Sequence, residues 1–334
     1  MFSGSMDILV IESPNGVYKS SAFHVRFGSL KVIKAKEQDI EIFVNYKKTE
    51  VTMKLSSSGD AYFQFDESDA QVLNQQNLYD KEIKNDLKEK DELLKNDINL
   101  FKKKYKSFFP SSNQIKQLNL KPERNEICFV CRTSSSGIQT LKSSIYLWSF
   151  NSKIVISDVD GTITRSDVLG QVLPMLGRDW THEGVTELFT KIINQGYKII
   201  YLTSRAIGQS TMTKNYLDSL IQEKKSLPAG PLIMSPDGLF TSLKREVIER
   251  KPHLLKIPVL SELKNLFPQN VSPFYAGFGN RETDGVAYRY VNIPLNNIFI
   301  IDTSSKVLRL GETKKGSYKL IADKIDETFP FIQH

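Results

Sequence analysis

The sequence predicts a protein of mixed class, an all-β part followed by an α/β part. Residues 7–65 contain short segments rich in branched and aromatic residues, which are typical of a β-sandwich or barrel. From residue 153 onward, apolar strands alternate with amphipathic helices, which indicates a parallel sheet with helices on both faces. The length of 334 residues fits roughly two domains.

The first 65 residues are expected to form five short strands. Turn signals such as Pro14-Asn15-Gly16 and the run Ser56–Asp60 separate them. The strands are Ile8–Ile11, His24–Phe27, Ile40–Tyr46, Val51–Leu55 and Ala61–Phe65. Five strands make a thin sandwich, so further strands are needed. Glu126–Cys131 and Leu141–Phe150 have strand character, which predicts one sandwich split over residues 1–67 and 118–150.

The stretch 68–117 between these parts is dominated by charged and amide residues, as in a linker. Its apolar residues nevertheless recur at helical spacing, which favours an amphipathic helix docked by one face, with a disordered linker as the alternative. The residues of this stripe are Ile83, Leu87, Leu94, Ile98, Phe101 and Tyr105.

Composition excludes several classes of protein. The 2 Cys, Cys128 and Cys131, exclude a disulfide-stapled scaffold and fit a reducing compartment. They lie three apart in a predicted strand and point to opposite faces, so we expect them to pack rather than to bind zinc. The net charge of +7 suits an anionic partner without choosing one. No apolar run approaches the ~20 residues of a membrane span, and no signal peptide is recognisable.

The α/β part, residues 151–334, is expected to alternate strictly. Its predicted strands are Ile154–Ile156, Ile199–Leu202, Leu232–Met234, Phe274–Phe278 and Ile298–Ile301. Its predicted helices are Glu183–Asn194 with Thr181 as N-cap, Gln209–Lys224, Leu243–Arg250, Pro252–Phe267, Thr283–Arg289 and Ser317–Thr328.

Ligands of parallel sheets bind beyond the carboxyl ends of the strands, so the residues after each strand identify the candidate site. Asp158-Val159-Asp160-Gly161-Thr162 follows the first strand, Thr203-Ser204-Arg205 the second, and Gly279–Asp284 a later one. Two lysines, Lys251 and Lys256, lie in the segment between. Carboxylates, a hydroxyl, an ammonium and an amide are therefore predicted to converge on one edge of one sheet.

This set of groups suits phosphoryl transfer. One aspartate can accept the phosphoryl group, and a second can act as general acid and base. Oxygen ligands from Asp158, Asp284, the backbone carbonyl of Asp160 and Asn280 would suit magnesium.

Thr203 can donate a hydrogen bond to a phosphate oxygen, and Arg205 can pair with phosphate or with a carboxylate. We favour Lys251 over Lys256 as the phosphate-binding lysine, with Lys244 third, because Lys251 precedes Pro252 at a helix start. His182 is expected to be structural.

These elements match the haloacid dehalogenase superfamily, and longer stretches resemble the lipin family. The stretches are Ile156–Asp167, Leu169–Gln171, Asp179–His182, Tyr201–Gly208, Arg245–Pro252 and Phe274–Arg281. Phe23–Gly28 and Gly59–Phe63 resemble the family's N-terminal region, N-Lip, and Leu118–Pro122 and Ile145–Trp148 the strands before its catalytic core, C-Lip.

The resemblance implies a Rossmann-like haloacid dehalogenase catalytic domain beside a split immunoglobulin-like sandwich. It implies a Mg²⁺-dependent phosphatidate phosphatase that cleaves phosphatidic acid to diacylglycerol and phosphate. By position, Asp158 is the nucleophile and Asp160 the general acid/base, while Asp284 and Asn280 complete the metal site. The phosphate would be held by Thr203, Ser204, Arg205, Lys251, Gly161 and Thr162.

The implied partner is phosphatidic acid at a membrane surface, reached by transient peripheral contact without a transmembrane span. No nucleic acid is expected, and the implied place is the cytoplasm, on the endoplasmic reticulum or nuclear membrane. Relatives usually begin with an amphipathic helix, which is expected to be missing here. Two other functions remain open: a phosphatase or mutase of soluble phosphoesters, and a non-enzymatic lipid-binding module.

Overall fold

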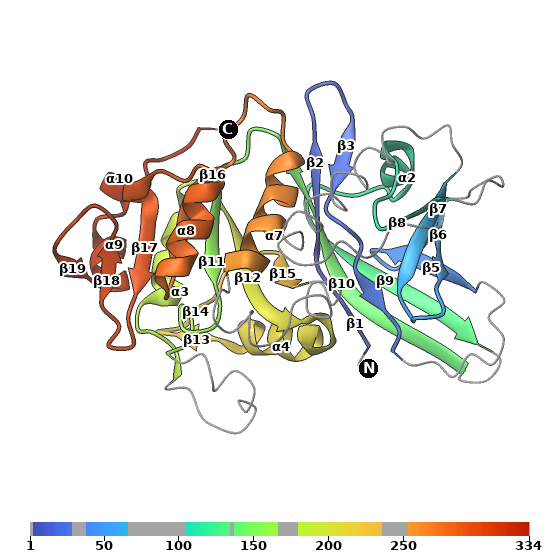
Figure 1. Ribbon diagram of the computed structural model, residues 1–334, viewed down its shortest axis with the longest axis horizontal. Coiled ribbons are helices and arrows are strands. Elements are labelled where there is room, and N and C mark those ends of the chain that lie inside the picture. The colour runs from blue at the N-terminus through green and yellow to red at the C-terminus, as the bar shows by residue number, and fades with distance from the viewer. Residues whose placement is uncertain are drawn as a thin grey trace, which may run out of the picture. The chain divides into compact units, whose positions relative to one another are not determined.

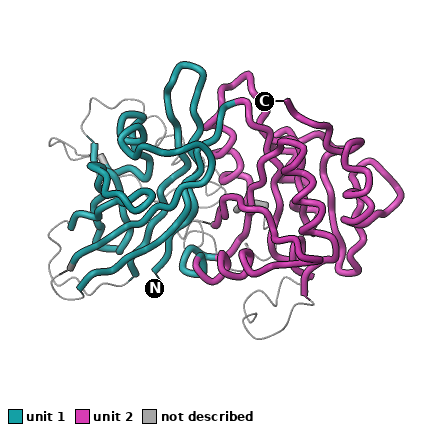
Figure 2. The backbone as a smooth tube through the Cα atoms, turned by 180° about the vertical axis from the view of Figure 1, so that it is seen from behind, with its two compact units in different colours: residues 1–150, 206–210, 235–248 teal, residues 151–205, 211–234, 249–334 magenta. Residues whose placement is uncertain are grey.

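The computed structural model describes residues 3–28, 38–65, 105–133, 137–165, 180–235 and 253–333, and Figure 1 labels their helices and strands. The chain forms two compact units, coloured in Figure 2. Unit 1 comprises Met1–Phe150, Ala206–Ser210 and Ser235–Ile248, and unit 2 the remainder. The four-part division predicted from sequence stays a prediction, and the predicted stripe from Ile83 to Phe101 lies outside the described residues.

Unit 1 contains an eight-stranded sheet with the order β3-β2-β10-β9-β5-β6-β7-β8. Its strands are β2 (Ile8–Glu12), β3 (Tyr18–Ser20), β5 (Asp39–Val44), β6 (Lys47–Leu55), β7 (Ala61–Phe65), β8 (Tyr105–Ser107), β9 (Glu123–Thr133) and β10 (Gly137–Ser149). A separate pair is formed by β1 (Gly4–Ser5) and β4 (Val25–Arg26), and α2 spans Ser112–Gln117. Strands from both sides of residues 66–104 thus pair in one sheet.

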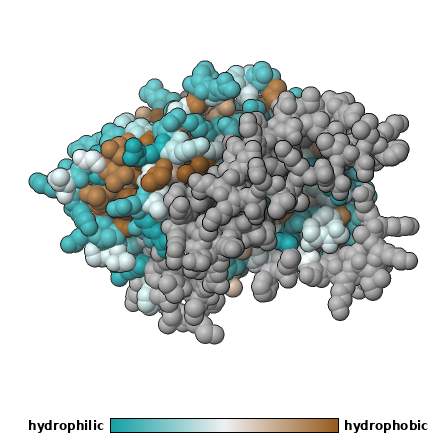
Figure 3. Space-filling view, viewed as in Figure 1, coloured by the Kyte–Doolittle hydropathy of each residue, from teal (hydrophilic) through white to brown (hydrophobic). Residues whose placement is uncertain are grey.

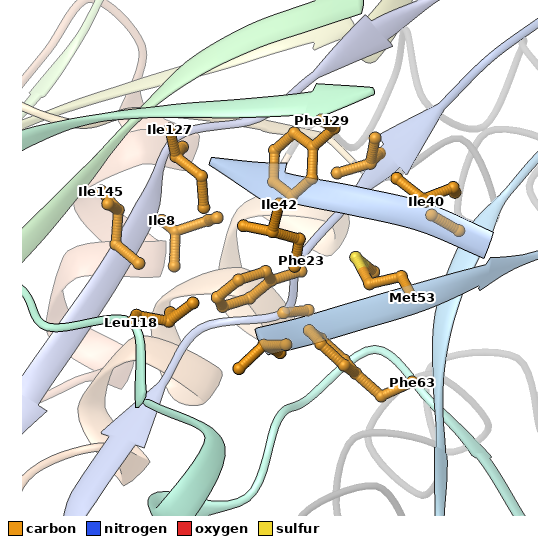
Figure 4. Close-up of a cluster of buried hydrophobic side chains, with 14 of the residues drawn as sticks. Ile8, Phe23, Ile40, Ile42, Met53, Phe63, Leu118, Ile127, Phe129 and Ile145 are labelled. Carbon is orange, nitrogen blue, oxygen red and sulfur yellow. The ribbon is translucent and has the colours of Figure 1, made fainter. Parts of the chain in front are cut away.

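The sheet curls around a single apolar core. Neighbouring strands lie ~4.8 Å apart, so a flat sheet would hold its second and seventh strands too far apart for their side chains to share a core. Nevertheless β2, β7 and β9 contribute Ile8, Phe63 and Phe129 to the same cluster, and Phe23 lies 5.2 Å from Phe63 and 6.4 Å from Phe129 between ring centroids. Figure 4 shows these side chains pointing toward one another.

An immunoglobulin-like sandwich of two packed sheets is not confirmed, because the strands are hydrogen-bonded into one sheet. Two details of the strand prediction were also wrong. Tyr105 lies in β8, which pairs antiparallel with β7, rather than in a helix. The strand predicted to reach Tyr46 ends at Val44, since Asn45 and Tyr46 have φ of 48° and 66° and form the tight turn to β6.

Unit 2 contains a seven-stranded sheet with the order β15-β12-β11-β16-β17-β18-β19. The central pairings β12–β11, β11–β16 and β16–β17 are parallel, as predicted, whereas β17–β18 and β18–β19 are antiparallel. The strands are β11 (Ile154–Asp158), β12 (Lys198–Ala206), β15 (Leu232–Ser235), β16 (Phe274–Gly279), β17 (Ile298–Ile301), β18 (Val307–Arg309) and β19 (Lys315–Gly316).

Helices lie on both faces of this sheet. Figure 1 shows α7 and α8 in front of it and α3 behind, and α3 packs with α9 and α10. The helices are α3 (Val185–Asn194), α4 (Ser210–Ser219), α7 (His253–Asn265), α8 (Glu282–Tyr290), α9 (Tyr318–Asp323) and α10 (Ile325–Thr328). The short 3-10 helix η4 (Leu295–Asn297) also belongs to unit 2, whereas the 3-10 helix η3 (Ile207–Gln209) lies in the residues assigned to unit 1.

Three predicted helices differ from those observed. The helix expected over Ser317–Thr328 is broken at Lys324 into α9 and α10, because Lys324 leaves the helical conformation. The helix expected over Gln209–Lys224 ends at Ser219, because Glu223 and Lys224 take positive φ and turn β13 (Ile221–Gln222) into β14 (Lys225–Ser226). The N-cap of α3 is Gly184 in the left-handed conformation, not Thr181. The helix predicted over Leu243–Arg250 lies outside the described residues.

The surface carries apolar residues among polar ones, and Figure 3 shows such patches over the part of unit 2 that contains α8 and β17. Val286 and Tyr290 on α8 are 50% and 64% exposed. In the part of the chain that the structure describes, no helix has the length and apolar character needed to cross a membrane.

Burial of His24 should make unit 1 sensitive to acid. Burial lowers the pKa of His24 from 6.5 to about 4, so the unfolded chain binds this proton more readily than the folded unit. The stabilisation is therefore complete above pH 6.5 and lost as the pH falls toward 4. We expect the free energy of unfolding at pH 5 to fall by about 2 kcal/mol through this group, and His24→Gln to remove that dependence.

The measurement is urea unfolding followed by tryptophan fluorescence in a Trp180→Phe background. The chain has 2 Trp, so Trp148 of unit 1 then reports alone. An equal pH dependence in the His24→Gln variant would contradict the assignment.

Candidate functional site

Three neighbouring strands of unit 2 bring the candidate residues together at their carboxyl ends. Asp158 is the last residue of β11, Thr203 lies near the end of β12, and Asp284 lies in the first turn of α8, directly after β16. Because β12, β11 and β16 are adjacent and parallel, these three side chains meet at one edge of the sheet. The convergence expected from sequence is therefore present in the structure.

The carboxylate of Asp158 is held on both oxygens. Every residue of β11 is buried, and Asp158 itself is 4% exposed. The Thr162 hydroxyl donates to Oδ2 at 3.1 Å, and Lys256 Nζ donates to Oδ1 at 2.6 Å. This carboxylate is consequently fixed in the interior with one defined orientation.

Lys256 bridges two buried carboxylates. Its ammonium lies 2.6 Å from Asp158 Oδ1 and 2.5 Å from Asp284 Oδ1, and its side chain is 7% exposed. The other oxygen of Asp284 accepts hydrogen bonds from the backbone N–H groups of Asn280 (2.9 Å) and Arg281 (3.0 Å). These donors lie at the positive end of α8, which favours a carboxylate there.

A glycine makes this approach possible. A Cβ on Gly279 would lie 2.4 Å from the Cβ of Asp284, closer than any two such atoms can come. Only glycine therefore lets the end of β16 pass this close to the first turn of α8. The glycine that opens the predicted site segment Gly279–Asp284 thus has a packing reason.

The charges in this cluster do not balance. Burial raises the pKa of Asp158 to about 7, and the neighbouring Asp284 adds to the rise, while Lys256 opposes it. Burial disfavours the ammonium of Lys256, but the two carboxylates outweigh this and raise its pKa. Two carboxylates therefore share one ammonium, which leaves the place suited to a further cation.

Whether a metal fits can be judged from the donors. Among the described residues no group of three or more His, Cys, Asp or Glu side chains stands ready to hold a metal ion. Asp158 and Asp284 do offer oxygen atoms within reach of one bridging cation, as Lys256 shows. A hard cation such as magnesium prefers oxygen ligands and keeps several waters, so two carboxylates fit it.

Asp160 points to different partners than Asp158. Arg205 approaches it with both Nη2 (2.5 Å to Oδ1) and Nε (3.1 Å to Oδ2), and the Thr203 hydroxyl donates to Oδ2 at 2.9 Å. Arg205 also donates to Thr213 Oγ1 at 3.1 Å. Of the two partners left open from sequence, the structure shows Arg205 paired with a carboxylate.

The remaining predicted residues are placed as follows. Ser204 is half-buried and lies two residues before the end of β12, and Gly161 takes a φ of +82° in the turn after β11. Lys251 and Lys244 lie outside the described residues, so the preference for Lys251 stays a prediction. The lysine that the structure brings to the carboxylates is Lys256, the second choice in the prediction from sequence.

His182 and Tyr318 make hydrogen bonds in this region that the sequence did not predict. His182 lies with Nε2 3.2 Å from the Gly161 carbonyl oxygen, and Tyr318 donates to the Thr162 carbonyl oxygen at 2.9 Å. His182 was expected to be structural, and Tyr318 was not singled out. Its position 156 residues after Thr162 carries no local signal of this contact.

A parallel sheet with acidic groups at its carboxyl edge agrees with a haloacid dehalogenase-like domain, the class to which the matched family domain belongs. The family model described as LNS2 (Lipin/Ned1/Smp2) matches residues 106–330, and the model of the lipin N-terminal conserved region matches residues 1–81. The first match alone covers more than half of the chain, so the chain belongs to the lipin family.

Curated relatives agree with this assignment. The chain is 48% identical over 222 residues to phosphatidate phosphatase PAH1 of Arabidopsis thaliana, covering 66% of this chain and 25% of the relative. It is 44% identical over 226 residues to human phosphatidate phosphatase LPIN3, covering 67% and 27%. It is 44% identical over 228 residues to nuclear elongation and deformation protein 1 of Schizosaccharomyces pombe, covering 67% and 34%. The chain thus spans a quarter to a third of these relatives' lengths.

Removing the bridging ammonium should destabilise unit 2. Lys256→Met leaves two buried carboxylates without their shared partner, so we expect the free energy of unfolding at pH 8 to fall by about 3–5 kcal/mol. The loss should shrink at pH 5, because Asp158 is then protonated. Urea unfolding at both pH values measures it.

Lys225→Met provides the matched control. Lys225 pairs with Glu187 at 3.2 Å but is 41% exposed, so its loss should cost at most about 1 kcal/mol. If both substitutions lowered the free energy of unfolding equally, the buried bridge would contribute no more to stability than the exposed ion pair.

Proposed function

We propose that this chain is a magnesium-dependent phosphatidate phosphatase that hydrolyses phosphatidic acid to diacylglycerol and phosphate. The observation that carries the proposal is the buried carboxylate of Asp158, held by Thr162 and Lys256 beside Asp284. Its sequence lies within the stretch matched by the family model, and relatives carry the name phosphatidate phosphatase.

The reaction is proposed in two steps. Asp160 leaves Arg205 and takes up a proton from solvent as substrate binds. An oxygen of Asp158 then attacks the phosphorus of the phosphomonoester, the bond to the diacylglycerol oxygen breaks, and Asp160 gives that proton to the leaving oxygen. Water then attacks the phosphorus of the aspartyl-phosphate while Asp160 takes a proton from it. The bond between phosphorus and the Asp158 oxygen breaks, which releases phosphate and restores the carboxylate.

The supporting groups have distinct tasks. Thr162 holds one oxygen of Asp158, which leaves the direction of attack defined. In binding substrate, Asp160 exchanges its pair with Arg205 for the leaving oxygen, and Thr203 and Arg205 then donate to the phosphate. Ser204, Gly161, Thr162 and Lys251 complete the proposed phosphate pocket.

Magnesium would be held by Asp158 and Asp284, with the backbone carbonyl of Asp160 and with Asn280. When bound, it supplies positive charge against the phosphate oxygens, the main electrostatic requirement of phosphoryl transfer. The excess of carboxylates over ammonium around Lys256 supports this assignment.

The substrate places the enzyme at a lipid surface. A net charge of +7 favours approach to an anionic membrane, and the exposed Val286 and Tyr290 of α8 offer apolar contact. We propose transient peripheral contact with the endoplasmic reticulum or nuclear membrane, from the cytoplasmic side. Nothing in the proposed reaction calls for nucleic acid.

The first test is phosphate release from phosphatidate in mixed micelles, with magnesium and with chelator. Wild type should be active only with the divalent cation, and Asp158→Asn should lower kcat by at least about 10³-fold. Asp218→Asn, an exposed aspartate on α4, should stay at the wild-type rate. Preference for a soluble substrate such as glycerol 3-phosphate over phosphatidate would replace the lipid assignment with a metabolite phosphatase.

Substitutions of Lys256 and Lys251 should change different kinetic constants. Lys256→Met should lower kcat, because Lys256 contacts the nucleophile, whereas Lys251→Ala should raise KM for phosphatidate with a smaller change in kcat. Steady-state kinetics on folded variants, checked by circular dichroism, measure this. A KM effect confined to Lys256→Met would exchange the two roles.

A further inference from the structure

The two peptide groups that flank Thr162 are each held by a buried side chain from elsewhere in unit 2. Nε2 of His182 lies 3.2 Å from the carbonyl oxygen of Gly161, and the hydroxyl of Tyr318 donates to the carbonyl oxygen of Thr162 at 2.9 Å. His182 is 0% exposed and Tyr318 is 1% exposed. Both contacts are therefore shielded from competing water.

The hydrogen-bond partners fix the form of the imidazole. The Gly161 carbonyl can only accept, so Nε2 of His182 must carry the proton. Burial lowers the pKa of His182, which favours the neutral ring. Nδ1 then accepts from the Ser305 hydroxyl, which lies 2.8 Å away. A hydrogen-bond relay thus forms, in which Ser305 donates to His182 and His182 donates to the Gly161 carbonyl.

Ser305, where this hydrogen-bond relay begins, lies in a turn that is held by its own hydrogen bonds. Ser305 lies at a φ of 63° in the turn between β17 and β18. The carboxylate of Asp302 accepts from the backbone N–H groups of Ser304 and Lys306, both at 3.0 Å, and so closes that turn. His182 therefore ties the loop after β11 to a rigid turn after β17.

The other end of this hydrogen-bond relay, at Gly161, lies next to Thr162, which contacts the proposed nucleophile Asp158. Gly161 and Thr162 form the two peptides that set where the Thr162 side chain points, and Thr162 is itself 0% exposed. Its hydroxyl donates to Asp158 Oδ2 at 3.1 Å. A rotation of either peptide would move this hydroxyl and release one oxygen of the carboxylate.

We propose that His182 and Tyr318 are positioning residues that orient Asp158 for attack by clamping the backbone on both sides of Thr162. This inference rests on the proposed function, in which Asp158 is the nucleophile. The residues touch no reacting atom in this scheme and act only through Thr162.

The test compares three substitutions. His182→Phe keeps the volume but removes donor and acceptor, Tyr318→Phe removes only the donor, and His182→Gln keeps one donor and one acceptor. For phosphate release from phosphatidate, the two Phe variants should lower kcat by about 10- to 100-fold with KM within about twofold. His182→Gln should recover most of the loss.

A matched control separates positioning from buried hydrogen bonding in general. Tyr197→Phe removes another buried tyrosine hydroxyl, which donates to the Pro330 carbonyl at 3.1 Å near the opposite end of β12. It should leave kcat unchanged. The proposal is overturned if Tyr318→Phe behaves like Tyr197→Phe, if His182→Gln is no better than His182→Phe, or if KM changes instead of kcat.

A double-mutant cycle tests whether the effect passes through Thr162. In a Thr162→Val background the hydroxyl contact with Asp158 is already lost, so adding Tyr318→Phe should change kcat less than about twofold. Fully additive effects would show that Tyr318 acts by another route.

A spectroscopic measurement keeps the proposal independent of substrate identity. In ¹⁵N NMR of the full chain, His182, assigned by its loss in the His182→Gln variant among the 4 His, should show a protonated Nε2 and an unprotonated Nδ1. A protonated Nδ1 overturns the clamp. Wild type that shows this pattern but releases no phosphate from phosphatidate refutes the proposed function alone.

Discussion

The ammonium of Lys256 between the carboxylates of Asp158 and Asp284 is the interaction on which the rest of the site depends. Each of the three groups is buried, and each would cost several kcal/mol to bury alone. Together they tolerate burial, because the bridge places opposite charges within 2.6 Å. The compensation is incomplete, since two carboxylates share one cation and the pKa of Asp158 still rises to about 7.

Three secondary-structure elements hold these charged groups together in the interior. The end of β11 presents Asp158, the first turn of α8 presents Asp284 with two backbone N–H groups, and α7 presents Lys256. β11 is a central strand of the sheet, whereas α7 lies between β15 and β16 in the chain and α8 between β16 and β17. Sites built on strand ends and helix termini hold their geometry better than sites on long loops, because packing locks the supporting backbone.

The parts of the site that sequence could predict are those fixed by local pattern. Asp158, Thr203 and Asp284 follow apolar strands, and the rule that parallel strands carry ligands at their carboxyl ends brings them together. The choice between Lys251 and Lys256 depended on where a helix starts and which way it faces. Spacing does not determine either, because five residues on a helix turn a side chain well away from its starting direction.

Local sequence patterns also failed to predict parts of the fold. Helical spacing of apolar residues suggested that Tyr105 belongs to a helix, but pairing with β7 places it in a strand. Tertiary pairing overrides local periodicity in such short segments. The curl of the eight-stranded sheet of unit 1 also leaves no local signal, because alternation of buried and exposed residues is the same in a flat sheet, a sandwich and a curled one.

The two aspartates of the Asp158-Val159-Asp160 sequence lie two residues apart in different surroundings. Asp158 lies in the interior, where donors on both oxygens hold its carboxylate in one direction. Asp160 is half-buried and faces the guanidinium of Arg205 and the hydroxyl of Thr203. A nucleophile must keep one orientation, whereas a proton carrier must exchange partners during the reaction. The fixed position of the buried aspartate suits the first requirement and the half-buried one suits the second, which supports the division of roles proposed for them.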